Sequence, residues 1–311
     1  MLGTPLHFWV IFFATVAVAL AVDLGVFHRK SHTVHLKEAL LESLGWITVS
    51  LIFNAWVYYS QGHQAGLEFL TGYLVEKSLS LDNIFVFLII FQSFQIPAKS
   101  QHRVLFYGVI GALVMRALFV IAGVELLQYF HSVIYVFGAI LLFTALRMVL
   151  PSGRTTKPNQ NWLVRLTRRF IPYLDDPTAS GFFLKREGRW NATPLFMALV
   201  AVEAMDIVFA VDSVPAVLAI TRNTFIVYSS NAFAILGLRA LYFALAGLLP
   251  RFRFLHQGLA AILFFVGGKM VLSEWVTVSA PWSLATIAVI LAATIAASLL
   301  FPAPASATET N

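Results

Sequence analysis

The sequence predicts an all-α membrane protein that crosses the bilayer about nine times and contains an inverted repeat of three helices. Three observations support this prediction: the composition, the spacing of the apolar runs, and motifs that occur twice in the same order. Of the 311 residues, 59% are hydrophobic and 12% are charged, and the mean hydropathy is +0.81. A soluble domain carries about 25% charged residues, so this composition argues strongly against a soluble fold.

Apolar runs long enough to cross a hydrocarbon core of about 30 Å recur along almost the whole chain. Turn residues, chiefly Gly, Pro and Asn, separate these runs. The first run is too long for the core of a signal peptide and follows no basic leader, so we expect a retained helix. The predicted spans are 8–27, 38–59, 67–91, 103–124, 130–150, 194–220, 225–248, 255–273 and 282–300.

The basic residues lie almost entirely on one predicted side of the membrane. Sixteen Lys and Arg residues lie in or beside the first, third, fifth and seventh loops, and the opposite loops hold only Arg222. Because basic loops stay in the cytoplasm, we expect the N-terminus outside and the C-terminus inside. The net charge of +6 and the pI near 9.7 then reflect these loops and not a nucleic-acid partner.

The stretch 151–193 is the one sizeable polar segment between the predicted spans. Its aromatic residues alternate with Arg and Lys, which predicts a basic amphipathic segment on the anionic inner leaflet. A regulatory or partner-binding role stays open. We expect this cytoplasmic loop to separate residues 1–150, with spans one to five, from residues 194–301, with spans six to nine. Residues 302–311 are predicted to be disordered.

The motifs of spans three to five recur in spans six to eight. Glu76 precedes Asp82-Asn83 by six residues, as Asp206 precedes Asp212-Ser213. The later counterparts are Arg116-Ala-Leu-Phe with Arg239-Ala-Leu-Tyr, and Arg147-Met148-Val149-Leu150 with Lys269-Met270-Val271-Leu272. The offsets of 130, 123 and 122 residues keep the order. Because each unit (67–150 and 194–273) has three spans, the second is inserted in the opposite direction, as in many secondary transporters.

Ionisable residues lie near the centres of these spans, where each charge costs about 2.5–3.5 kcal/mol. The bases Lys77, Arg116 and Arg239 are expected to balance charge. The central acids outnumber them by two, and Asp23 in span one would make the excess three. Such an excess suits a divalent cation or shared protons. The candidate metal ligands are Glu76, Asp82, Asn83, Glu203, Asp206, Asp212 and Ser213, with Asp23 as a further candidate.

The candidate ligands are oxygen atoms, because the chain has no cysteine and its histidines lie in loops or near span ends. Oxygen ligands favour Mg²⁺, Ca²⁺ or Mn²⁺ over Zn²⁺ or copper. Met205 would add a soft ligand for Mn²⁺, or it packs in the core. Pro215 either frees a carbonyl near Asp212 for a cation or only kinks the helix. His28, His32 and His35 either capture metal near Asp23 or belong to a solvated loop.

The stretches 76–83 and 202–215 resemble the signature segments of the TerC/Alx family, and the resemblance extends from Asp23 to about span nine. The family is named for tellurium resistance and is grouped with the LysE-like exporters. The resemblance implies an exporter of Mn²⁺ in the bacterial inner membrane, and our leading hypothesis adds weaker transport of Ca²⁺. It also implies functional roles for the matched residues Glu76, Asp82, Asn83, Glu203, Asp206 and Asp212.

The sequence indicates a secondary transporter and not an enzyme. It contains no nucleotide-binding Gly-x-x-x-x-Gly-Lys-Ser/Thr motif and no nucleophile–base pair, and we expect no permanently bound cofactor. Proton coupling through the same carboxylates and a homo-oligomeric assembly stay open. The alternatives are a membrane scaffold for tellurium or metal stress resistance and an exporter of a small organic solute.

Overall fold

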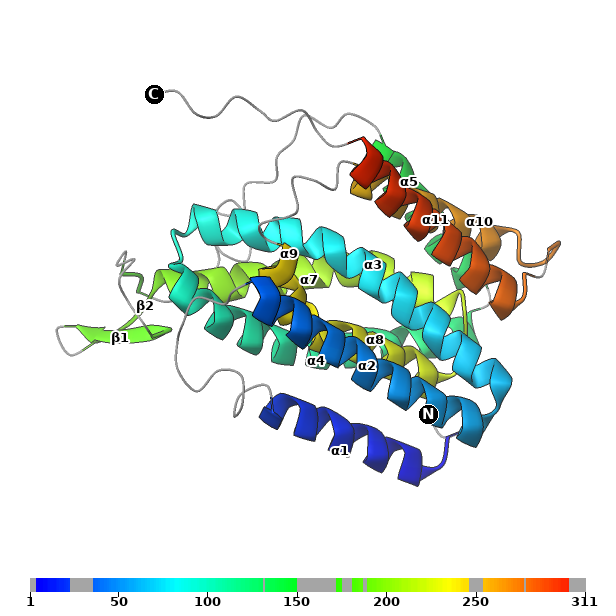
Figure 1. The fold of residues 1–311 in the computed structure, drawn as a ribbon, viewed down its shortest axis with the longest axis horizontal. Coiled ribbons are helices and arrows are strands. Elements are labelled where there is room, and N and C mark those ends of the chain that lie inside the picture. The colour runs from blue at the N-terminus through cyan, green and yellow to red at the C-terminus, as the bar shows by residue number, and fades with distance from the viewer. Residues whose placement is uncertain are drawn as a thin grey trace.

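Figure 1 shows the fold in a computed structural model of the chain. The structure describes residues 4–22, 36–130, 132–149, 172–174, 181–186, 189–245, 254–276 and 278–301. Within these ranges, the side chains of six residues are not described: Leu81, Asp82, Phe85, Gln128, Leu245 and His256. The predictions for Asp23, for the three histidines at 28, 32 and 35, and for the tail at 302–311 therefore lie outside the described residues.

The described chain is almost entirely helical. The first half contains α1 (Leu6–Val22), α2 (Leu36–Gln61), α3 (His63–Ser93), α4 (Ala98–Tyr129) and α5 (Val133–Val149). The second half contains α7 (Pro194–Leu218), α8 (Thr224–Leu236), α9 (Leu238–Leu245), α10 (Leu255–Val271) and α11 (Ala280–Leu300). A helix, or in one case a pair of helices, lies at each of the nine positions that the apolar runs predict.

Local sequence explains several of the helix boundaries. Gly62, at φ 98°, lets α2 turn directly into α3. Pro194 at the first turn of α7 needs no hydrogen-bond acceptor there. The Asn223 side chain accepts hydrogen bonds from the backbone N–H groups of Phe225 (3.0 Å) and Ile226 (3.4 Å) at the start of α8.

Among the residues that the structure describes, five helical segments are long and apolar enough to cross a membrane: Leu36–Gln61, Ala98–Leu127, Pro194–Leu218, Thr224–Ala244 and Ala280–Leu300. Three shorter apolar helices accompany them: Leu6–Val22, Val133–Val149 and Gln257–Val271. Helix α3 has 31 residues, but its centre carries Glu76, Lys77 and Asp82. An all-α membrane protein is thus supported, whereas nine crossings stay a prediction.

The predicted seventh span is not one regular helix. Helix α8 ends at Leu236, and α9 begins at Leu238. Between them the Gly237 N–H bonds to the carbonyl of Ile235, two residues back, instead of continuing the regular pattern. Nearby, the Lys77 ammonium donates a hydrogen bond to the Ala234 carbonyl (3.2 Å). The apolar pattern could not reveal this break, because a single glycine is also tolerated inside a helix.

The helices pack in a pattern that a two-fold relation would produce. Helices α5 and α10 form the most extensive contact, and α5, α10 and α11 lie together at one side of the molecule (Figure 1). The next most extensive contacts are α3 with α8 and α4 with α7, and these two are equally large. Under the predicted repeat, α3 corresponds to α7 and α4 to α8, so exchanging the halves exchanges these two contacts. The repeat itself stays a prediction.

The end of the predicted 151–193 loop forms a feature that the sequence did not predict. Strands β1 (Phe183–Arg186) and β2 (Arg189–Ala192) pair antiparallel, and the hairpin lies beyond one end of the helices (Figure 1). The Thr193 hydroxyl donates to the carbonyl of Gly181 (2.8 Å), which ties the hairpin to the start of α7. Most of the predicted membrane-surface segment lies outside the described residues.

Candidate metal site

Side chains from three helices surround one buried guanidinium, which a fourth helix supplies. Arg116 of α4 is 1% exposed. Its Nη1 donates to Glu76 of α3, to the Ser213 hydroxyl of α7 (2.8 Å) and to the Asn231 carbonyl of α8 (3.3 Å). Its Nη2 and Nε contact the two carboxylate oxygens of Asp206 of α7 (3.2 and 3.4 Å). We call these five residues the Arg116 cluster.

The cluster joins the two predicted halves through their matched acids. Glu76 and Asp206 occupy equivalent positions in the two motifs, and the structure places both against Arg116. Asp206 and Ser213 can both reach Arg116 because residues seven apart share a helix face. The second oxygen of Glu76 accepts a hydrogen bond from the Asn231 amide (3.0 Å). One cation thus faces two carboxylates, so Arg116 compensates only part of the buried negative charge.

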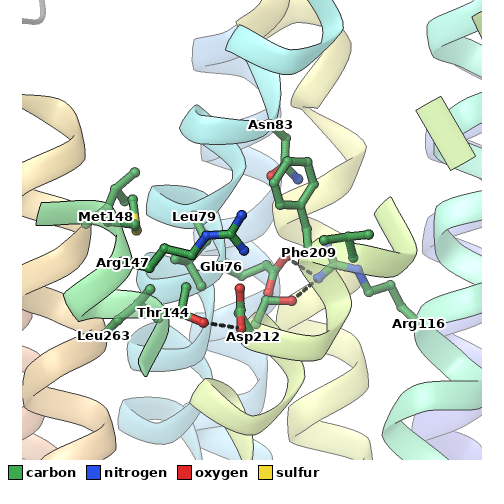
Figure 2. A pocket seen from close by; sticks show the side chains of 13 residues that line it. Glu76, Leu79, Asn83, Arg116, Thr144, Arg147, Met148, Phe209, Asp212 and Leu263 are labelled. Carbon is green, nitrogen blue, oxygen red and sulfur yellow. Dashed lines mark hydrogen bonds and ion pairs between the residues drawn. The ribbon is translucent and has the colours of Figure 1, made fainter. Parts of the chain in front are cut away.

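A cavity of about 280 Å³ lies beside the cluster (Figure 2). It is lined by Glu76, Leu79, Asn83, Arg116, Thr144, Arg147, Met148, Val208, Phe209, Asp212, Ser213, Leu259 and Leu263. The Thr144 hydroxyl of α5 donates to Asp212 (2.9 Å), which fixes that carboxylate at the cavity wall. Arg147 reaches from α5 toward Glu76 and Asp212 (Figure 2).

The cavity lies toward one end of the bundle. Thr144, Arg147 and Met148 belong to the last turns of α5, and Leu259 lies one turn into α10. These are the ends next to the loops in which the basic residues gather. We call this the basic end; the positive-inside prediction places it in the cytoplasm.

The structure brings together only part of the predicted ligand set. Glu76, Asn83, Asp212 and Ser213 line the cavity, and Asp206 is held in the Arg116 cluster. The half-buried Glu203 carboxylate lies instead against Gly111 of α4, where an added Cβ would overlap it. The Asp82 side chain is not described. In the part of the chain that the structure describes, no group of three His, Asp or Glu side chains is arranged to hold a metal ion.

Met205 and Pro215 were predicted either to serve a bound cation or to have only a structural role. Met205 packs against an apolar cluster and does not line the cavity, which fits its packing interpretation. The thioether at the cavity is that of Met148, for which the sequence predicted no ligand role. Helix α7 continues through Pro215 to Leu218. Thr144, Arg147 and Asn231 were also missed, although Arg147-Met148 stands in a motif that the sequence repeats.

Of the three predicted charge-balancing bases, Arg116 and Arg239 pair with buried acids, and Lys77 donates to a backbone carbonyl. Arg239 of α9 forms a buried ion pair with Glu42 of α2 (3.2 Å). The pairing joins α9 to a helix outside the predicted repeat, and the sequence offered no signal for it because Glu42 lies near one end of its span. Lys77 donates to the Ala234 carbonyl beside the break at Gly237.

Removing Glu42 should destabilise the protein more than an ordinary surface change. Glu42→Ala takes the carboxylate from a salt bridge whose side chains are only 3% and 2% exposed. Breaking a buried pair in this way costs about 3–5 kcal/mol. We expect a lower midpoint of thermal aggregation in detergent, and partial recovery in Glu42→Leu/Arg239→Leu. An unchanged midpoint for Glu42→Ala would contradict a stabilising role for the pair.

Comparisons with known proteins agree with the architecture. The family model described as "Integral membrane protein TerC family" matches residues 61–305. The chain is 49% identical over 298 residues to an uncharacterised membrane protein of Myxococcus xanthus, covering 96% of this chain and 93% of the relative. It is 44% identical over 305 residues to a protein of Escherichia coli K12 named as a candidate membrane-bound redox modulator, Alx, covering 94% of each. No solved structure matches the chain.

Proposed function

Since the chain belongs to the TerC family of integral membrane proteins, we propose that it is a secondary transporter that exports a divalent metal ion. We take Mn²⁺ to be the principal ion and Ca²⁺ a weaker one. The ion would bind in the cavity beside the Arg116 cluster. The observation that carries the proposal is a cavity between the two predicted halves into which two carboxylates, Glu76 and Asp212, both face.

The chemistry of the cavity wall suits such an ion. Besides the two carboxylates it offers the Asn83 amide and the hydroxyls of Ser213 and Thr144. Hard divalent cations prefer such oxygen ligands. The Met148 thioether at the same wall adds one softer donor, which favours Mn²⁺ over Mg²⁺ and Ca²⁺.

Arg116 suggests how the site stays intact when no ion is bound. Its guanidinium lies between Glu76 and Asp206 and offsets part of their charge. An ion in the cavity would meet Glu76 and Asp212, which line it, and not Asp206, which does not. Binding would then draw Glu76 away from Arg116, while Asp206 keeps its two contacts with the guanidinium. Arg116 thus acts as a fixed counter-charge between transport steps.

Export also needs an energy source, because a negative cytoplasm attracts the ion. Moving one charge against 100 mV costs about 2.3 kcal/mol, and twice that for a divalent ion. With no nucleotide-binding motif in the sequence, we propose exchange against protons in the bacterial inner membrane, with the N-terminus outside and the C-terminus in the cytoplasm. If Mn²⁺ flux in vesicles is the same under every imposed proton gradient, the proposed proton coupling is wrong.

The name of the Escherichia coli relative suggests a different activity, redox modulation. This chain has no cysteine, so thiol–disulfide exchange is not chemistry that it can perform itself. An effect on cellular redox state would then follow indirectly from metal export.

The direct test is the manganese content of cells with and without the protein. We expect wild type to lower cell manganese under Mn²⁺ load, and Asp212→Asn to return it to the level of cells without the protein. Glu125→Gln is the matched control, because it makes the same acid-to-amide change on α4 outside the cavity. If Asp212→Asn accumulates normally and still lowers cell manganese, the carboxylate site is wrong and a scaffold function is favoured.

A further inference from the structure

The side chains that α5 and α10 contribute to the cavity lie between the middle of each helix and the basic end. From these two helices the cavity is lined by Thr144, Arg147, Met148, Leu259 and Leu263. The repeated motifs, which are 122 residues apart here, assign a counterpart in the other helix to each of these positions. In the same order, the counterparts are Val266, Lys269, Met270, Phe137 and Leu141.

The apolar counterparts gather in one closed cluster. Leu141, Val266 and Met270 are at most 1% exposed and belong to a single apolar cluster, against which Phe137 packs. Leu263 belongs to this cluster and also lines the cavity. The cluster therefore borders the cavity, and its residues Leu141, Val266 and Met270, with Phe137, fill the space between α5 and α10 from their middle toward the end away from the basic end.

The helices are packed tightly at this closed end. A Cβ atom on Gly138 would lie 2.7 Å from a Val271 methyl and 3.1 Å from the Gly267 carbonyl. A Cβ atom on Gly267 would lie 3.0 Å from the Gly138 carbonyl. The counterparts of these glycines are Ala260 and Ala145. Small residues thus stand at both ends of the α5–α10 contact, and they allow either end to close.

The charged positions follow the same relation. Arg147 lies at the cavity near the basic end, and its counterpart Lys269 lies near the far end of α10. Lys269 is half-buried and donates a hydrogen bond to the Ser283 hydroxyl of α11 (3.0 Å). At the basic end, Arg147 therefore faces the cavity, whereas at the opposite end its counterpart Lys269 is hydrogen-bonded to a neighbouring helix.

We propose that a second cavity opens between α5 and α10 at the end away from the basic end, lined by Phe137, Leu141, Val266 and Met270, when the first cavity closes. The inference rests on the proposed function, for which this cavity is the route by which the metal ion leaves. Asn83 and Ser213 are counterparts of each other, so they would face the ion in both states. Asp206, the counterpart of Glu76, would face it in the second state.

The test uses single cysteines, which the cysteine-free chain accepts without prior changes. Thr144→Cys reports on the first cavity, and Val266→Cys, its counterpart, reports on the second. A small membrane-impermeant thiol reagent is applied to cells and, separately, to inside-out vesicles. Two matched variants should shift the equilibrium between the two states. Gly138→Val adds a side chain that should force apart the end that is closed here. Ala260→Val, at the counterpart position, should do the same at the other end. Gly138→Ala adds a smaller side chain at the same position and is used if Gly138→Val does not accumulate.

We expect Thr144→Cys to react from the basic-end side and Val266→Cys to react, more slowly, from the opposite side. Gly138→Val should speed labelling of Val266→Cys several-fold and slow that of Thr144→Cys, and Ala260→Val should do the reverse. If Val266→Cys is never labelled from the opposite side, even in combination with Gly138→Val or Gly138→Ala, the proposal of a second cavity is wrong. If labelling changes sides as expected in a protein that moves no Mn²⁺, the proposed cargo is wrong and the second cavity stands.

Discussion

Replacing Arg116 with Leu should prevent the protein from accumulating in a folded form. The change leaves Glu76 and Asp206 buried without the cation that both contact. Removing one partner from a buried pair costs about 3–5 kcal/mol, which is a large part of the stability of an ordinary domain. The readout is the yield of monodisperse protein after extraction in mild detergent.

The controls for Arg116 separate charge from shape. Arg116→Lys keeps the charge but loses the two-point contact with Asp206, so we expect an intermediate yield. The triple variant Arg116→Leu/Glu76→Gln/Asp206→Asn removes the unpaired charges and should recover much of the yield while transporting no metal. If Arg116→Leu alone gives the wild-type yield, the guanidinium does not hold the two acids in the folded protein.

Glu76→Gln should abolish Mn²⁺ export while the protein still accumulates. The amide removes one of the two carboxylates that face the cavity, but its oxygen can still accept a hydrogen bond from Arg116. Loss of one charged ligand from a divalent site lowers affinity because hard cations bind charged oxygens most strongly. The readout is Mn²⁺ tolerance of cells, with membrane abundance of the variant measured alongside.

Asn231→Asp offers a matched rescue of Glu76→Gln. Asn231 lies within hydrogen-bond distance of both Glu76 (3.0 Å) and Arg116 (3.3 Å). The double variant therefore keeps the number of acids around Arg116 but moves one from α3 to α8, away from the cavity wall. We expect the double variant to accumulate at least as well as Glu76→Gln and not to regain export. Export by the double variant would show that charge alone is required, and that the position of Glu76 is not.

The sequence predicted the features that depend on long patterns or on charge in an apolar setting. Apolar runs located the helices, and repeated acidic motifs identified Glu76 and Asp206, which the structure joins through Arg116. A charge in an apolar helix must find a partner or a ligand, so these residues stand out in a single sequence.

Other features depend on which surfaces meet, and a single sequence does not contain that information. Thr144 and Arg147 lie near the end of an apolar run, where polar residues usually mark the start of a loop. Only the packing of α5 against α10 turns them toward the cavity. Glu42 was missed for the same reason, since its partner Arg239 comes from a helix almost 200 residues later. The β1–β2 hairpin is too short to stand out in a polar segment.

The most direct measurement of metal export is Mn²⁺ flux through purified protein in liposomes. The proposal predicts a saturable flux in wild type, which Ca²⁺ inhibits only at higher concentration, and no flux above empty liposomes in Asp212→Asn, with Glu125→Gln like wild type. Folded wild-type protein that moves no more Mn²⁺ than empty liposomes, under any imposed proton gradient, would contradict it.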